Sequence, residues 1–193
     1  ASTPVQYHLE YGFSCMGYEI PAALGAKLAR PESEVVAIVG DGTYQMLPQE
    51  IATIVSEGIK VILVLLDNGG YASIGALSES RGSQRFGTTY FTRNAATRSL
   101  DGAPPAIDLA ANAASMGAKV LTPSGIEEFR AAYAQAVASD VTTLIHIRTD
   151  LTGPNPPGSA WWDVPVAEVS TLASTQRARE EYLEALPAQR PYL

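Results

Sequence analysis

The chain has 193 residues, of which 46% are hydrophobic and 17% are charged, and its formal net charge is −7 at pH 7. These values are typical of a folded domain of ordinary size and exclude a disordered chain. The acidic balance argues against a nucleic-acid partner, and the longest apolar run, Val61–Leu66, is too short to cross a membrane. A single cysteine excludes an internal disulfide. The single cysteine fits a reducing compartment, and residues 1–10 do not resemble an export signal, so we expect a cytoplasmic location.

Ahead of the first strand, the sequence predicts a glycine-bearing loop and then a helix. The loop is Tyr11–Tyr18, and we expect Cys15 within it to be small and buried, because no base or positive charge lies beside it. The lone His8 before the loop is expected at the surface or in packing. The helix is Glu19–Arg30, and Pro21 fits its first turn, where no N–H group is needed.

Two apolar, β-branched runs predict buried strands of a parallel sheet, Val35–Val39 and Val61–Leu66. Between them, Leu47–Glu57 is expected to be a helix, so that strand, helix and strand form one βαβ unit. The strands of such a unit are parallel, and their carboxyl ends lie at the same edge of the sheet, where open α/β sheets bind ligands. We therefore expect Asp41 and Asn68, which follow these strands, to lie close together.

The two loops at this edge carry ligands for a hard cation. Asp41 offers a carboxylate and Asn68 an amide oxygen, which suit Mg²⁺ or Ca²⁺, and Mg²⁺ commonly completes its shell with phosphates and water. Gly42 and Thr43 lie just before a helix and offer N–H groups and a hydroxyl to an anion. Because the chain is acidic, a phosphate here needs a bridging cation. A turn capped by Asp41 is the alternative for an isolated Gly-Asp-Gly, and the second loop favours the cation.

The remaining chain completes an α/β fold with an open, mostly parallel sheet and helices on both faces. The expected elements are a short helix at Tyr71–Ser80, irregular chain at 81–105, a helix at Ile107–Met116, a strand at Lys119–Leu121, a helix from Ser124 to about Ser139, a strand at Thr143–Arg148 and a charged helix at Arg177–Leu186. Ser124 and Glu127 are expected to form a capping box. His146 is expected to be a satisfied core or edge histidine. Trp161 and Trp162 are expected to anchor a proline-rich arm.

The spacing of the two loops resembles a known fingerprint. Gly40-Asp41-Gly42 and Asp67-Asn68 are separated by 24 residues, positions 43 to 66. This is similar to the fingerprint of thiamine-diphosphate-dependent enzymes, in which Gly-Asp-Gly is followed by Asn-Asn. The first Asn of that pair is Asp67 here, whereas the second, which is the metal ligand, is intact as Asn68. The resemblance implies the diphosphate-binding fold, with thiamine diphosphate and Mg²⁺ as cofactors.

The resemblance also implies the residues that hold these cofactors. Met16 and Gly17 would lay backbone against the aminopyrimidine ring, and the third metal ligand would be the carbonyl of Gly70. The implied cofactor-binding set is Cys15, Met16, Gly17, Gly40, Asp41, Gly42, Thr43, Asn68, Gly70 and Tyr71, of which Asp41, Asn68 and Gly70 would hold the metal.

Further stretches are similar to one branch of this family, the 3D-(3,5/4)-trihydroxycyclohexane-1,2-dione hydrolases of myo-inositol breakdown. They are Tyr11–Ile20, Ser78–Gly87, Thr97–Gly102, and Trp161-Trp162 before Val166–Ser170. The branch implies cleavage of a C–C bond in the cyclic dione to give 5-deoxy-D-glucuronate. Arg81, Gln84 and Arg85 would be candidate substrate contacts, although composition alone describes their segment as a surface loop.

The family pattern divides the site between two domains. Residues 1–150 would bind the diphosphate and Mg²⁺, and residues 151–193 would be an arm and helix that pack on this domain or on a partner. An upstream pyrimidine-binding domain of another subunit would supply the activating glutamate, so the catalytic residue is unknown in this chain. We expect the chain alone to be inactive and the full-length protein to be a homodimer or homotetramer.

Two alternatives remain open at this point. One keeps the cofactor and changes the reaction, as in an acetohydroxyacid synthase-like or decarboxylase-like enzyme. The other is a non-catalytic nucleotide- or phosphate-binding α/β module. The first loop has neither Gly-x-Gly-x-x-Gly nor a Walker lysine, which argues against the second alternative.

Overall fold

The computed structural model describes residues 7–9, 13, 15–150 and 164–188. Its contacts divide the chain into two compact units. In the first, residues up to Asn68 combine with Ala106–Thr149, and in the second, Gly69–Pro105 combine with residues from Asp150 onward. Residues 69–105, which the sequence analysis includes in a domain 1–150, are thus grouped with the C-terminal part.

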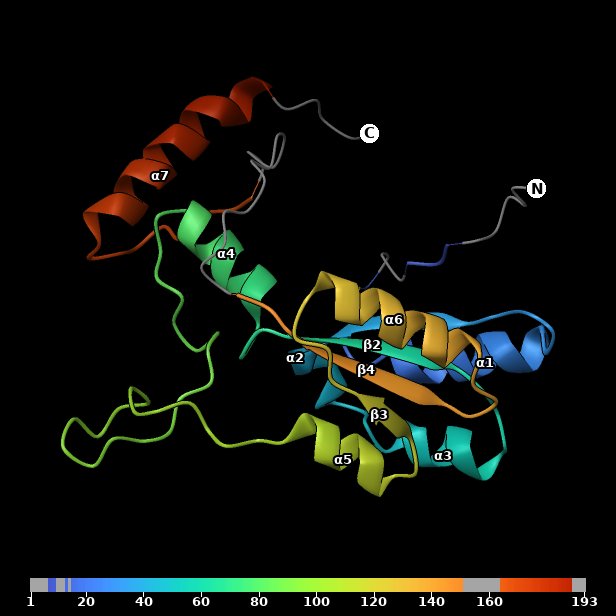
Figure 1. The fold of residues 1–193 in the computed structure, drawn as a ribbon. Helices are drawn as coiled ribbons and strands as arrows, with labels where there is room; N and C mark the ends of the chain where they lie inside the picture. The colour runs from blue at the N-terminus through green and yellow to red at the C-terminus, as the bar shows by residue number, and fades with distance from the viewer. Residues whose placement is uncertain (1–6, 10–12, 14, 151–163, 189–193) are drawn as a thin grey trace. The chain divides into compact units, whose positions relative to one another are not determined.

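The first unit is built on a parallel sheet of four strands (Figure 1). The strands are β1 (Val36–Gly40), β2 (Ile62–Asp67), β3 (Lys119–Leu121) and β4 (Thr143–Arg148), in the spatial order β1-β2-β4-β3. All three pairings are parallel, which confirms the expected sheet. The inner strands β2 and β4 are buried over most of their length, which the continuous apolar run of β2 predicts.

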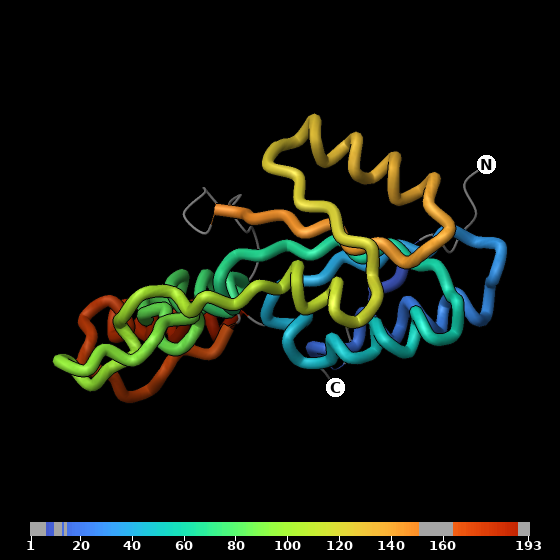
Figure 2. The backbone as a smooth tube through the Cα atoms, turned by 60° about the horizontal axis from the view of Figure 1, so that its bottom comes forward, coloured from blue at the N-terminus to red at the C-terminus, as the bar shows by residue number. Residues whose placement is uncertain are grey.

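Helices cover both faces of this sheet (Figure 2). On one face lie α1 (Glu19–Ala29), α3 (Glu50–Ser56) and α5 (Leu109–Ser115), and on the other lies α6 (Ile126–Val137). Side chains of β2 alternate between the two cores, with Leu63 facing α1, α3 and α5 and Val64 facing α6. The expected arrangement of helices on both faces is confirmed.

The structure differs from the expected elements at several helix starts. A one-turn helix, α2 (Asp41–Tyr44), follows β1 directly, and the helix expected from Leu47 begins at Glu50. The predicted capping box of Ser124 and Glu127 at the start of α6 is wrong by one residue, because Gly125 is the N-cap. Ser124 therefore pairs with Glu128, whose Oε2 accepts both the backbone N–H and the hydroxyl at 2.8 Å. These bonds lower the pKa of the Glu128 carboxyl.

The second unit contains α4 (Ala72–Ser80), irregular chain at 81–105, α7 (Ala173–Ala185) and a short 3₁₀ turn at Leu186–Ala188. The helix α7 begins four residues before the expected start at Arg177. Gly82 lies just after α4. Its carbonyl accepts hydrogen bonds from the hydroxyls of Ser174, at 2.6 Å, and Thr175, at 2.9 Å. These bonds tie the end of α4 to the first turn of α7.

Several expectations fall on residues that the structure does not describe. The proline-rich arm with Trp161 and Trp162 lies outside the described residues, as do Tyr11 and Gly12 of the first loop. Within the described ranges, every helix is too short or too polar to cross a bilayer.

Candidate functional site

The carboxyl ends of β1 and β2 bring Asp41 and Asn68 together, as the sequence predicts. The two strands are in register, with Gly40 opposite Leu66, so the residues that follow them meet at one edge. The backbone N–H of Asn68 donates to Oδ1 of Asp41 at 3.4 Å. The Asp41 side chain is nearly inaccessible, with 1% of its surface exposed. A carboxylate buried in this way is stabilised by a hydrogen-bond donor or a cation beside it.

Gly40 leaves open space where Asp41 begins α2. Its backbone has φ −80° and ψ 160°, which any residue adopts. A Cβ built on Gly40 would meet nothing within 4 Å. Neither backbone conformation nor packing within the chain therefore requires a glycine here, and the absent side chain leaves room for a ligand to approach the backbone closely.

Gly42 and Thr43 lie inside α2 rather than just before a helix. The first N–H groups of any helix lack a partner within the helix, and α2 has no side-chain cap at its start. The carbonyl of Asp41 accepts the backbone N–H of Gln45 at 3.1 Å, which closes this turn. The backbone donors expected for an anion thus remain at the edge of the sheet.

Gly17, in contrast, is required by the fold itself. It is buried with a φ of +93°, where residues with a side chain are strained. A Cβ there would lie 3.2 Å from the Cβ of Met46 and 3.3 Å from the Cδ1 of Leu47. The loop before α1 is thereby held against the segment that follows α2. Met16 beside it is 39% exposed.

Cys15 was expected to be buried, and this expectation is wrong. Its side chain is exposed, because it lies in a surface loop ahead of α1 where no core element covers it. His8 is exposed as expected, and its Nε2 lies 3.0 Å from the hydroxyl of Tyr18.

Gly70 and Tyr71 belong to the second unit, where backbone contacts fix them. Gly70 has a φ of +156° and forms an antiparallel bridge with Thr89. A Cβ on Gly70 would come within 2.3 Å of the carbonyl oxygen of Thr88. The N–H of Tyr71 donates to that carbonyl at 2.8 Å. The rings of Tyr71 and Tyr90 pack edge to face, with their centroids 5.6 Å apart.

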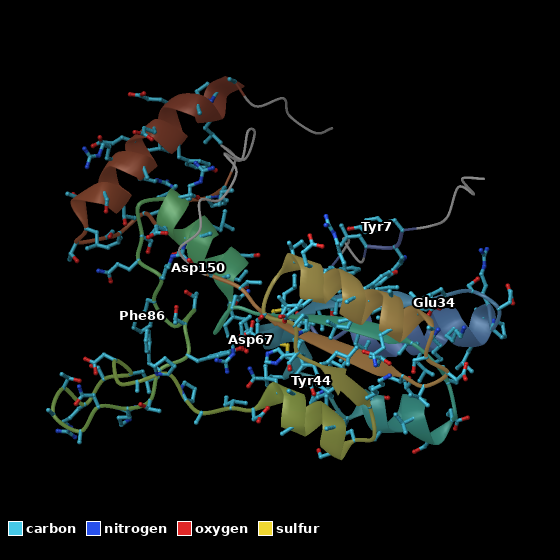
Figure 3. The ribbon with its side chains drawn as sticks, viewed as in Figure 1. Tyr7, Glu34, Tyr44, Asp67, Phe86 and Asp150 are labelled. Carbon is cyan, nitrogen blue, oxygen red and sulfur yellow. The ribbon has the colours of Figure 1, made fainter. Side chains whose placement is uncertain are left out.

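The candidate substrate contacts Arg81, Gln84 and Arg85 share one loop of the second unit. Arg85 is paired with Glu79, whose Oε2 lies 2.9 Å from Nε and 2.8 Å from Nη2. Gln84 is exposed, whereas Nε of Arg81 is buried and has no hydrogen-bond partner in the described part of the chain. Phe86 of the same loop is 92% exposed (Figure 3). Their role toward a substrate stays a prediction.

Sequence reasoning missed the partner of Asp67, the residue that departs from the fingerprint. Nε2 of His146 donates to Oδ2 of Asp67 at 2.9 Å across the neighbouring ends of β2 and β4. The N–H of Thr149 donates to the Asp67 carbonyl at 2.8 Å. His146 is thus a satisfied histidine, as expected. The pair holds the end of β2 directly before Asn68, and Figure 3 labels Asp67 at this place.

A second missed contact joins α2 to α5. The hydroxyl of Tyr44 donates to Oδ1 of Asn112 at 2.7 Å, and Tyr44 is completely buried (Figure 3). Burial raises the pKa of Tyr44 to about 12, which keeps the phenol neutral. The two residues are 68 positions apart, and no local pattern marks them as partners. The contact fixes the turn that carries Asp41.

The donor set at this edge fits Mg²⁺. The side chains of Asp41 and Asn68 offer oxygens, which Mg²⁺ prefers while it keeps waters and phosphate oxygens in its shell. Among the described residues, no group of three or more His, Cys, Asp or Glu side chains could hold a metal without further ligands. An ion here would therefore need ligands from backbone, water or a bound phosphate, and the space beside Gly40 admits one.

Comparisons with known proteins agree with this geometry. Residues 1–147 match the family model described as thiamine pyrophosphate enzyme, C-terminal TPP binding domain. A 3D-(3,5/4)-trihydroxycyclohexane-1,2-dione hydrolase of Bacillus cereus is 44% identical over 189 residues, which cover 98% of this chain and 29% of the relative. A protein of the same name from Bacillus thuringiensis is 43% identical over the same shares. The chain thus spans less than a third of the length of these curated relatives.

Solved structures of similar fold include a thiamine diphosphate-dependent 4-hydroxybenzoylformate decarboxylase of Rhodococcus jostii, with a TM-score of 0.57 and 27% identity. The match covers 70% of this chain and 23% of that chain. A benzoylformate decarboxylase of Polynucleobacter necessarius matches with a TM-score of 0.56 and 26% identity, over 72% of this chain and 24% of the other. The family model, the sheet and the paired loops agree: the chain belongs to the thiamine pyrophosphate enzymes and contains their C-terminal TPP binding domain.

Proposed function

We propose that the chain is the cofactor-binding domain of a thiamine-diphosphate-dependent hydrolase. The enzyme would cleave a C–C bond of 3D-(3,5/4)-trihydroxycyclohexane-1,2-dione and give 5-deoxy-D-glucuronate in myo-inositol degradation. The observation that carries the cofactor assignment is the juxtaposition of Asp41 and Asn68 at one edge of the sheet. The similarity to hydrolases of that name, 44% over 98% of the chain, supports the reaction.

The residues of this chain would divide the work of binding. The carboxylate of Asp41, the amide oxygen of Asn68 and the carbonyl of Gly70 would hold Mg²⁺, while the N–H groups of Gly42 and Thr43 meet the diphosphate. Bound thiamine diphosphate supplies an electron sink for C–C cleavage. The buried carboxylate of Asp41, at 1% exposure, gains a cation that offsets its lost hydration.

The loop before α1 would serve the cofactor, and the loop after α4 would serve the substrate. Cys15, Met16 and Gly17 would line the cofactor, and the left-handed backbone of Gly17, which glycine adopts without strain, would fix their direction. The exposed Gln84 and the half-buried Arg81 and Arg85 would offer contacts to a polyhydroxylated substrate.

The remaining parts of the enzyme would come from outside this chain. We propose that a pyrimidine-binding domain of another subunit supplies the activating glutamate, that the full-length protein is a cytoplasmic homodimer or homotetramer, and that the chain alone does not turn over. The relatives are more than three times as long as the matched region, which covers 29% of each, and this leaves room for such a domain.

A decarboxylase is the second candidate, because the matching solved structures carry that name. A turnover screen of the longer polypeptide, with thiamine diphosphate and Mg²⁺, separates the two. The cyclic dione should be consumed with release of 5-deoxy-D-glucuronate, whereas benzoylformate and pyruvate should give no carbon dioxide. Carbon dioxide release without dione consumption would contradict the proposed reaction and leave the cofactor assignment intact.

A further inference from the structure

The peptide group between Asp67 and Asn68 is bonded to the chain on both sides of β2. Its carbonyl accepts the backbone N–H of Thr149, just after β4, at 2.8 Å. Its N–H group, which belongs to Asn68, donates to Oδ1 of Asp41, just after β1, at 3.4 Å. Because a peptide group is planar, these two bonds together fix its orientation. The Cα of Asn68 follows directly, so its position is fixed as well.

The side chain of Asp67 adds a third bond, which also leads to β4. In the parallel register Asp67 lies opposite Arg148, and Leu65 lies opposite His146. Residues two positions apart on a strand share a face of the sheet, so the side chains of Asp67 and His146 lie on the same face. The Nε2 of His146 donates to Oδ2 of Asp67 at 2.9 Å.

The surrounding structure restricts both members of this pair. The side chain of His146 is 9% exposed and that of Asp67 is 18% exposed. Arg148 also lies near the pair, with its Nε 4.0 Å from the same carboxylate oxygen, but its side chain is 84% exposed. Such an exposed contact contributes little. Of these two contacts, the bond to His146 is therefore the one that directs the Asp67 side chain toward β4.

This arrangement gives the two acidic residues at the edge of the sheet different tasks. Oδ1 of Asp41 faces the N–H of Asn68, whereas Oδ2 of Asp67 faces β4. A carboxylate at position 67 is an oxygen ligand of the kind that Mg²⁺ accepts, and it stands where the fingerprint has Asn. Its bond to His146 instead commits this carboxylate to the neighbouring strand.

We propose that Asp67 and His146 are positioning residues for the metal site. The pair would hold the peptide group that carries Asn68, so that the Asn68 amide oxygen is presented together with the Asp41 carboxylate. This inference rests on the proposed function, because it assigns the pair a role toward the Mg²⁺ of that site. Groups that orient metal-binding residues commonly contribute about 10–100-fold to metal affinity.

The test is the affinity of the longer polypeptide for Mn²⁺, a paramagnetic substitute for Mg²⁺ that takes the same oxygen ligands, in the presence of thiamine diphosphate. Electron paramagnetic resonance reports the free Mn²⁺ and therefore measures binding without turnover. Asp67→Ala, His146→Phe and the double variant remove the hydrogen bond. Asp67→Asn keeps an oxygen that accepts from Nε2 of His146.

Thr142→Val is the matched control, because Thr142 joins the same two strands at their opposite ends. Its side chain is buried, and its hydroxyl donates to the carbonyl of Ile59 at 2.7 Å and accepts the N–H of Val61 at 3.2 Å. Ile59 and Val61 precede β2, and Thr142 precedes β4. The control variant should therefore lose stability in urea without any change at the carboxyl ends of the strands.

Asp67→Ala and His146→Phe should each raise the dissociation constant for Mn²⁺ about tenfold. The double variant should show the same rise as either single variant, because both changes remove one bond. Asp67→Asn should recover most of the affinity, and Thr142→Val should bind Mn²⁺ as tightly as wild type.

An affinity that falls in Asp67→Ala but is kept or increased in His146→Phe would identify Asp67 as a direct metal ligand and overturn the proposal. Variants that all bind as wild type does would also overturn it. A loss in Thr142→Val as large as that in His146→Phe would do the same, because it would reflect stability alone. Wild type that binds no Mn²⁺ would contradict the proposed metal site itself, and this inference with it.

Discussion

Gly17→Ala should destabilise the chain strongly, because both the backbone and the packing at this position exclude a side chain. The φ of +93° costs an alanine about 1–2 kcal/mol. The methyl group would also lie 3.2 Å from Met46 Cβ and 3.3 Å from Leu47 Cδ1, and such overpacking costs about 1–3 kcal/mol. Together these costs predict a loss of about 2–5 kcal/mol in the free energy of unfolding, or roughly 5–20 °C in Tm.

The matched control is Gly25→Ala, the same chemical change within α1. Gly25 has open space around a built Cβ and lies inside the helix Glu19–Ala29, where alanine is favoured over glycine by about 0.5–1 kcal/mol. Urea denaturation of both variants should therefore show opposite signs. A Gly17→Ala variant as stable as wild type, or a Gly25→Ala variant that loses more, would refute this reasoning.

Three further changes test individual contacts. Tyr44→Phe removes the hydrogen bond to Asn112 and should lower the free energy of unfolding by about 1 kcal/mol. Because the pKa of Tyr44 in the folded protein is raised to about 12, the stabilising contribution of the tyrosine should be complete below pH 10 and should fall toward pH 12. Urea midpoints measured against pH should show this fall in wild type only. Asp67→Ala leaves the N–H of His146 without its acceptor and should lower the free energy of unfolding by about 1–3 kcal/mol. Asp67→Asn keeps an acceptor and should lower it less. Equal losses of stability for the two variants in thermal melts would contradict the pairing. In Gly82→Ala, the added Cβ would lie 2.3 Å from the carbonyl oxygen of Ser174 in α7. The start of α7 should therefore become more accessible to limited proteolysis. An unchanged cleavage pattern would contradict this prediction.

The strands could be predicted from the sequence because each one is marked by the pattern of its own residues. Lys119–Leu121 and Thr143–Arg148 have the expected bounds, and the parallel register places Asp41 beside Asn68. The strands before Asp41 and Asn68 are apolar runs, a pattern typical of parallel strands that is visible without any partner. The edge that carries the candidate site follows from this pattern and from the βαβ connection.

The side-chain partners could not be predicted, because they depend on strand order. His146 and Asp67 are 79 positions apart and meet only because β4 lies between β2 and β3. Tyr44 meets Asn112 for a similar reason, through α5 on the same face as α2. The sequence also cannot distinguish Gly17, which its own neighbours require, from Gly40, where the space is empty.

The most direct test of the central claim is the thermal stability of the chain with thiamine diphosphate, with and without Mg²⁺. Wild type is compared with Asp41→Asn, which keeps the acceptor for Asn68 but loses the charge, and with Asp140→Ala as an exposed control. Each variant is referred to its own ligand-free midpoint. Ligand at 100 times its dissociation constant stabilises a folded protein by about 2.7 kcal/mol.

We predict a rise in the midpoint that needs both Mg²⁺ and the Asp41 carboxylate and that survives Asp140→Ala. The longer polypeptide, with the pyrimidine-binding domain, should show a larger rise under the same conditions. A rise that is independent of Mg²⁺ and retained in Asp41→Asn would contradict the metal site, and no rise in the longer polypeptide would contradict thiamine diphosphate binding itself.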